Sequence, residues 1–222
     1  MKNSRAMQGL EVERSGKRQF GSRIEQVIEV LSTKVRLLTL EQIAESFFHD
    51  LSRPIDSARA ALRRAERLGL VVTKWGMAHP RISVLAPLYR YDEAESTPAP
   101  LFGRLSWHAR RRFGKAPVRT LYATATHTCK AALVGGSARV GVRTSELTHD
   151  LCVGEVWLRL RQTDPERAAV WQGEDELDSV GIRPDALTGD MAVEFVGKYS
   201  AQKLTRLYQE YVFARVPRFE FW

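Results

Sequence analysis

Apolar residues recur at helical spacing in three consecutive segments near the start of the chain. Residues 23–31, 40–48 and 58–68 each place them three or four positions apart, which predicts three amphipathic helices. Thr39 and Gln42 match a capping box at the start of the second helix, and Gly69 is typical of a residue that ends a helix. The apolar positions are Ile24, Val27, Ile28 and Leu31, then Leu40, Ile43, Ala44, Phe47 and Phe48, then Ala58, Ala61, Leu62, Ala65 and Leu68.

The apolar pattern changes to that of extended chain after the third helix. Residues 70–76 predict a strand, and residues 81–85 predict the strand that returns beside it. Three helices followed by a hairpin are typical of a winged helix-turn-helix, so we expect residues 21–90 to form a DNA-binding domain.

Basic residues follow one side of the predicted third helix. Arg59, Arg63 and Arg67 are spaced at i, i+4 and i+8, opposite the apolar side, so they would form one ridge. With Lys74 of the predicted wing, this ridge is suited to the phosphates and guanine edges of duplex DNA. The alternative is a solvated arginine face on a helix that packs against protein.

The formal net charge is +8, and the charged residues are distributed unevenly along the chain. Residues 1–20 are polar and basic and are interpreted as a mobile tail. Residues 91–100 are acidic and contain prolines, which indicates a linker. Residues 101–145 contain no acidic residue, whereas residues 146–222 are rich in acids. This division indicates polyanion binding by the basic segments and cation binding by the acidic one.

The basic segment after the linker also contains an aromatic residue. Arg110, Arg111 and Arg112 follow Trp107 closely, which favours a patch that binds a nucleic acid strand by phosphate contacts and stacking. The alternative is again a solvated basic face.

Membrane and metal-thiol signals are missing from the sequence. No apolar run approaches the length of a membrane span, and the basic N-terminus lacks an apolar signal region. Cys129 and Cys152 are not in a metal-binding pattern and are interpreted as buried thiols. We therefore expect a cytoplasmic protein with no membrane partner.

The stretch from residue 180 to 204 carries the candidate chemistry. Pro184 and the turn at residues 188–190 flank short extended segments, and the second segment, residues 191–196, is apolar except for Glu194. Alternation along a strand would bring Asp185, Glu194 and Lys198 together, which offers two carboxylates for a hard cation and one ammonium for a phosphate. The alternative is an ordinary ion pair on a solvated face.

The surrounding segments complete the predicted second domain, residues 101–222. Residues 146–161 predict a helix that carries His149, Asp150 and Glu155. A helix is expected at residues 200–214, and short strands at residues 168–171 and, at a sheet edge, at 217–222.

The order of these segments resembles PD-(D/E)xK nucleases, which have the restriction-endonuclease-like fold. More narrowly, the chain is similar to the replication-relaxation family of plasmid proteins and to MobC-type mobilisation relaxases, in which a winged helix precedes the nuclease-like domain. The matching pieces are LTLEQIAESFF, ALRRAERLGLV, THDLCVGEVWLRLR, VWQGEDEL, RPDA and AVEFVGKYSAQKL. The resemblance implies an α+β chain whose second domain has a mixed central sheet.

The resemblance also implies site residues. Asp185, Glu194 and Glu155 would hold Mg²⁺ or Mn²⁺, with Asp150 as the second choice for the third acid, and His149 matches a family histidine. The family places a lysine two residues after the glutamate, where this chain has Val196. Lys198 would have to serve instead, with Lys203 as a further candidate.

Two functions follow as expectations. The first is a metal-dependent relaxase or endonuclease that nicks duplex DNA, for example at a plasmid transfer origin, in mobilisation or replication. The second is a catalytically inactive regulator of plasmid replication or transcription that binds DNA through its winged helix, which Val196 favours. Either protein would act with mobilisation or replication partner proteins, and winged helices also mediate homodimers.

Overall fold

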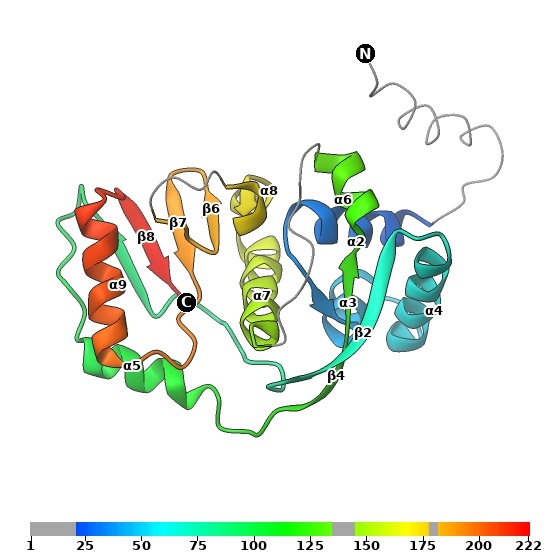
Figure 1. The fold of residues 1–222 in the computed structure, drawn as a ribbon, viewed down its shortest axis with the longest axis horizontal. Coiled ribbons are helices and arrows are strands. Elements are labelled where there is room, and N and C mark those ends of the chain that lie inside the picture. Colours follow the sequence, from blue (N-terminus) through cyan, green and yellow to red (C-terminus); the bar gives the residue numbers. More distant parts are fainter. Residues whose placement is uncertain (1–20, 135–144, 178–181) are drawn as a thin grey trace, which may run out of the picture. The chain divides into compact units, whose positions relative to one another are not determined.

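The computed structural model describes residues 21–134, 145–177 and 182–222. Within these residues, eight α-helices accompany two open sheets, one of three strands and one of five (Figure 1). The expected α+β class and the presence of a mixed sheet are therefore confirmed. The predicted tail, residues 1–20, lies outside the described residues. None of the helices in the described part is both long enough and apolar enough to cross a membrane.

The contacts within the chain divide it into two units, each described here by itself. The first contains residues 21–33, 37–74 and 121–134. The second contains residues 34–36, 75–120, 145–177 and 182–222. The segment at residues 121–134, which lies within the predicted second domain, thus packs with the N-terminal helices.

The first unit contains the three predicted amphipathic helices. They are α2 (Ser22–Thr33), α3 (Leu40–Phe47) and α4 (Pro54–Arg67), which pack against one another. The predicted capping box is present, with Thr39 and Gln42 bonding each other's backbone N–H groups. Gly69 has a φ of +69°, the left-handed conformation expected just after α4. A further helix, α6 (His127–Val134), packs against α2.

The three-stranded sheet differs from the predicted hairpin. Its order is β1 (Leu38–Thr39), β4 (Val118–Ala125), β2 (Val71–Ala78), so the neighbour of β2 comes from far along the chain. The prediction of a return strand at residues 81–85 is wrong, because these residues form no strand. Ile82 and Val84 are buried in alternation, as in a strand, but this segment is held by side chains of another helix. Arg159, for example, donates to the carbonyl of Leu85.

The five-stranded sheet belongs to the second unit. Its order is β3 (Tyr89–Asp92), β8 (Arg218–Phe221), β7 (Met191–Glu194), β6 (Ala186–Thr188), β5 (Trp171–Gly173). Strands β7 and β8 are parallel, and the other neighbouring pairs are antiparallel. Two predictions are corrected: Tyr91 and Asp92, assigned to a linker, lie in β3, and the last strand lies inside the sheet rather than at its edge.

Helices pack on this sheet through one apolar cluster. The helices of the second unit are α5 (Phe102–Arg111), α7 (Leu147–Thr163), α8 (Pro165–Ala169) and α9 (Ala201–Phe213). Side chains of α5 and α9 meet those of β7 and β8 in the cluster. Its buried members are Leu105, Ala109, Ala192, Val196, Leu204, Tyr211, Phe219 and Phe221. The helix predicted at residues 146–161 and the one at 200–214 are confirmed, whereas residues 168–169 end α8 and the strand begins only at Trp171.

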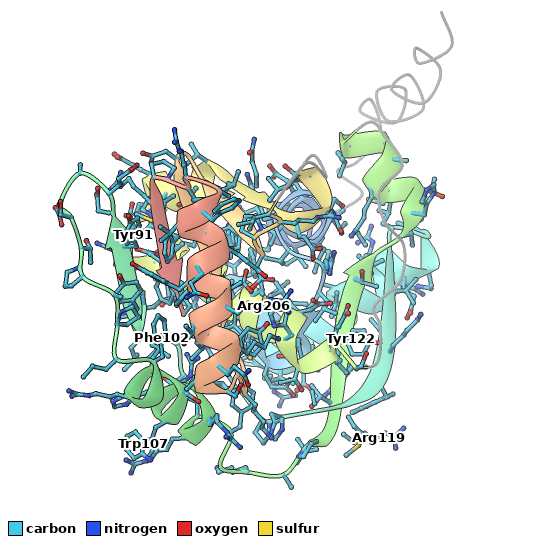
Figure 2. The ribbon with its side chains drawn as sticks, turned by 60° about the vertical axis from the view of Figure 1, so that its left-hand side comes forward. Tyr91, Phe102, Trp107, Arg119, Tyr122 and Arg206 are labelled. Carbon is cyan, nitrogen blue, oxygen red and sulfur yellow. The ribbon has the colours of Figure 1, made fainter. Side chains whose placement is uncertain are left out.

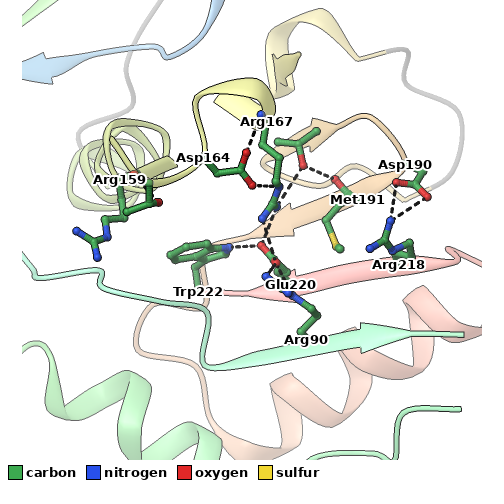
Figure 3. Close-up of polar contacts among 11 residues, drawn as sticks. Arg90, Arg159, Asp164, Arg167, Asp190, Met191, Arg218, Glu220 and Trp222 are labelled. Carbon is green, nitrogen blue, oxygen red and sulfur yellow. Dashed lines mark hydrogen bonds and ion pairs between the residues drawn. The ribbon is translucent and has the colours of Figure 1, made fainter. Parts of the chain in front are cut away.

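A buried carboxylate fixes the position of β8. Glu220 is fully buried and accepts hydrogen bonds from Arg90 Nε at 2.7 Å, Arg167 Nη2 at 3.0 Å and Trp222 Nε1 at 2.8 Å (Figure 3). Because two guanidinium groups and an indole satisfy it, the carboxylate is paired despite its burial. These contacts join β8 to β3 and to α8.

Candidate functional site

Two carboxylates meet where β6 begins and β7 ends. The turn that joins these strands contains Gly189 at a φ of +68°, a conformation that favours glycine. In the antiparallel register Ala186 lies opposite Val193. One further step places Asp185 opposite Glu194, on the same side of the sheet, where paired residues have Cβ atoms about 5 Å apart. The predicted juxtaposition of these two acids is therefore present.

Helix α7 adds an imidazole to the pair. The Nε2 atom of His149 lies 2.8 Å from Asp185 Oδ1, and the backbone N–H of Phe195 donates to Asp185 Oδ2 at 2.7 Å. The His149 ring also packs edge-on against Phe195. Burial lowers the pKa of His149, but the charge and hydrogen bond of Asp185 outweigh burial and raise that pKa to about 9. His149 is therefore an imidazolium at neutral pH, and it donates to Asp185.

Glu194 lies deeper than Asp185. Burial, and next the charge of Asp185, raise the pKa of Glu194 well above its usual value, while His149 opposes that rise. Tyr211 of α9 donates its hydroxyl to Glu194 Oε2 at 3.1 Å. Burial and the same two carboxylates raise the pKa of Tyr211, which keeps the hydroxyl protonated as a donor. The carboxyl of Glu194 thus holds a proton more readily than an exposed glutamate does.

Helix α7 also carries Asp150, directly after His149. Burial raises the pKa of Asp150 to about 6, although the charges of Arg36 and His149 lower it. Its Oδ1 lies 3.6 Å from Arg36 Nη1, whereas its Oδ2 is buried and has no hydrogen-bond partner among the residues that the structure describes. Arg36 also pairs with Glu174 and Asp175, each at 2.7 Å. Glu174 lies in the sequence piece VWQGEDEL that carries part of the family resemblance, and it is thereby tied to α7 through Arg36.

Other predicted site residues have different partners. Glu155 forms a two-pronged ion pair with Arg81, with distances of 2.8 and 3.0 Å. Lys198 Nζ lies 3.0 Å from His79 Nε2 and over the ring of Phe113. Strand β7 ends at Glu194, so the alternation that was to place Lys198 beside the acids does not continue to it.

Two more positions bear on the missing strand lysine. Val196 is fully buried in the apolar cluster that α5 and α9 form with the sheet. Lys203 of α9 lies with its Nζ 3.3 Å from the centre of the Tyr199 ring, and its charge is near enough to lower the pKa of Glu194 slightly.

The predicted DNA-binding arginines fall into two groups. In the first unit, Arg63, Arg67 and Lys74 are exposed, and Arg59 pairs with Asp56 at 3.2 Å. In the second unit, the exposed ones are Arg110 and Arg111.

Arg112 differs from its neighbours because it points inward. Its Nη2 donates to the C-terminal carbonyl of Trp222 at 2.9 Å, and its guanidinium lies over the Phe195 ring. Burial lowers the pKa of Arg112. This arginine holds α5 to the end of the chain and is less accessible to DNA than Arg110 and Arg111.

Sequence reasoning missed two members of the site. They are Tyr211, which donates to Glu194, and Arg36, which pairs with Asp150. Tyr211 lies three turns along α9 from the strand, and Arg36 lies in a short connection after α2, so no local spacing links either residue to Asp185. A buried tyrosine that needs a hydrogen-bond acceptor was the available signal.

Comparisons with known proteins identify no relative. No protein-family model, no curated protein and no solved structure gives a significant match to this chain.

Proposed function

We propose that this chain is a DNA-binding protein of a plasmid or mobile element whose second unit nicks DNA with the help of a divalent cation. The observation that carries this proposal is the pair Asp185 and Glu194. A buried and a partly buried carboxylate at the ends of neighbouring strands, with a protonated histidine against one of them, are typical of a functional site rather than of a solvated face.

The residues present fit a hard cation. In the described part of the chain no set of three or more His, Cys, Asp or Glu side chains is arranged as metal ligands. Mg²⁺, however, is commonly held by one or two carboxylates together with waters and substrate phosphates. Glu194 is buried beside Asp185, and both its burial and the charge of Asp185 raise its pKa, so a cation would relieve the repulsion between the two carboxylates; Asp185 and Glu194 would hold the ion.

When bound, such an ion lowers the pKa of a coordinated water and polarises a phosphate oxygen. The chain's own groups set the geometry. His149 and the Phe195 N–H fix the orientation of the Asp185 carboxylate, and Tyr211 fixes one oxygen of Glu194. The imidazolium also supplies positive charge close to where a phosphate would lie.

The first unit supports the DNA-binding part of the proposal. Its three helices and its sheet order β1-β4-β2 agree with a winged helix in which β4 takes the place of the predicted return strand. In that arrangement α4 is the recognition helix, and its exposed Arg63 and Arg67 face solvent. The segment between β2 and β4 is then an insertion in the wing.

The test is cleavage of supercoiled plasmid in Mg²⁺ or Mn²⁺, followed as conversion to open circles. We expect Asp185→Asn and Glu194→Gln to abolish conversion and Asp190→Asn to retain it, because Asp190 is an exposed turn residue of the same hairpin. Equal conversion by the parent, Asp185→Asn and Glu194→Gln would show that the activity arises elsewhere.

One observation favours the second candidate, a DNA-binding regulator without catalysis. Val196 occupies the lysine position inside the apolar cluster, and Lys198 is directed to His79. Titration calorimetry separates the candidates: tight duplex binding with no uptake of Mg²⁺ or Mn²⁺ at millimolar concentration favours the regulator. Metal uptake that Glu194→Gln removes favours the enzyme.

A further inference from the structure

Two tryptophan side chains of the second unit are left in solvent. Trp75 in β2 is 56% exposed and Trp107 in α5 is 53% exposed. All five tryptophans lie in the described part of the chain, and the other three, Trp157, Trp171 and Trp222, are buried. An exposed indole leaves a large apolar face in water, so a pair of them marks candidate contact sites.

Each exposed indole carries an arginine on one face. The guanidinium of Arg119 in β4 lies 4.7 Å from the centre of the Trp75 ring, and that of Arg111 lies 4.9 Å from the centre of the Trp107 ring. Both arginines are themselves exposed, and Figure 2 shows Trp107 on α5 and Arg119 on β4. The two sites therefore share one composition, which is a flat π-surface beside an exposed positive charge.

The charge around these pairs selects the kind of ligand. Residues 101–120, which include α5 and the start of β4, contain six Lys or Arg residues and no acidic residue. Met77, close to Trp75 on the same strand, and Val118, next to Arg119, are also largely exposed. A basic surface repels basic protein partners and attracts a polyanion, while indoles in water favour a ligand with flat apolar faces.

We propose that two pairs, Trp75 with Arg119 and Trp107 with Arg111, each form a contact site for single-stranded nucleic acid. Unstacked bases lie on the two indoles, and the arginines contact the neighbouring phosphates. Duplex DNA keeps its bases stacked on one another and offers no free base face, so it uses only the charges. This inference deepens the proposed function, since a nicking protein must hold a separated strand, but it requires no cleavage.

The test measures binding without metal, so its outcome is independent of the cleavage assay. A fluorescently labelled strand of about 20 thymidines is titrated in chelator with the parent, Trp75→Ala, Trp107→Ala and Phe213→Ala, and affinity is read by anisotropy. Phe213, which is largely exposed at the end of α9, is the matched control for loss of a surface aromatic. We expect each tryptophan variant to bind roughly 5- to 150-fold more weakly and Phe213→Ala to bind as the parent does.

A second readout uses the tryptophans themselves. Because the other three are buried, quenching of intrinsic fluorescence by unlabelled oligothymidine should come from Trp75 and Trp107, and the double variant Trp75→Phe with Trp107→Phe should lose it. Affinities of both alanine variants within twofold of the parent would overturn the proposal. So would an equal loss of affinity for a duplex of the same length, since the contact would then be to the backbone.

Discussion

The ion pair between His149 and Asp185 predicts an unusual dependence of stability on pH. The folded pKa of about 9 for His149 lies above the usual value of 6.5. A histidine with a raised pKa contributes stability that is complete below pH 6.5 and is lost as the pH rises through 9. Between these values the unfolded chain has released the proton and the folded chain still holds it.

The magnitude follows from the shift. Each unit of pKa corresponds to about 1.4 kcal/mol, so the pair contributes about 3 kcal/mol at low pH. Within the window, the free energy of unfolding should fall by about 1.4 kcal/mol per pH unit because of this single proton. Only about a quarter of the His149 side chain is exposed, 28%, so solvent screening reduces this estimate little.

The perturbation is His149→Gln, whose amide can still donate a hydrogen bond to Asp185 but carries no charge. Denaturant unfolding is followed by tryptophan fluorescence, which reports on the second unit because all five tryptophans lie there. The difference in stability between parent and variant should be about 3 kcal/mol near pH 6.5 and should shrink steadily toward pH 9. The difference also cancels the contribution of Cys152, whose pKa burial raises to about 12.

The control is His108→Gln, which replaces an exposed histidine of α5 that lies against Trp107. Its curve of stability against pH should run parallel to that of the parent. If the His149→Gln curve also runs parallel to the parent's, His149 is not an imidazolium in the folded protein, and the charge assigned to this site is wrong.

Three further outcomes are expected. Glu220→Ala should lower the free energy of unfolding, measured in denaturant titrations, by about 3–5 kcal/mol, because it leaves the partly buried Arg167 without its carboxylate partner. A loss below about 1 kcal/mol would mean that the contacts of Glu220 do not stabilise the fold as a unit. Arg63→Ala should weaken duplex binding without changing the melting temperature. In a salt titration it should lower the slope of log affinity against log salt by about one unit, and an unchanged slope would exclude a phosphate contact. Cys152 should remain unmodified by a thiol reagent in the native protein and react once the protein is unfolded in denaturant, since its thiol is buried; rapid native labelling would contradict its placement.

The sequence predicted the elements whose contacts are local. Helices α2, α3, α4, α7 and α9 follow from apolar spacing and caps, and the β6–β7 hairpin follows from its turn. It did not predict which distant strands pair. An alternating segment such as residues 81–85 is equally compatible with a strand and with an extended chain packed along a helix, because the ladder partner is decided by the whole fold.

The same distinction explains the candidate site. Asp185 and Glu194 could be placed together because they flank one hairpin. The family resemblance placed Glu155 in this site as well, which is wrong: six residues along a helix correspond to about 600° of rotation, so His149 and Glu155 leave α7 in directions about 120° apart. His149 therefore faces Asp185 while Glu155 faces Arg81.

The valine at position 196 can be interpreted from its surroundings. It packs with Leu105, Ala109 and Leu204, where α5 and α9 close over the sheet. A lysine there would place an ammonium among apolar side chains, and an unpaired buried charge costs several kcal/mol. Val196 thus stabilises the packing of both helices and leaves the strand without a cation of its own. The positive charge that faces Asp185 comes instead from helix α7, as the imidazolium of His149. Both proposed functions share this arrangement, and they differ in whether a metal ion joins it at Glu194.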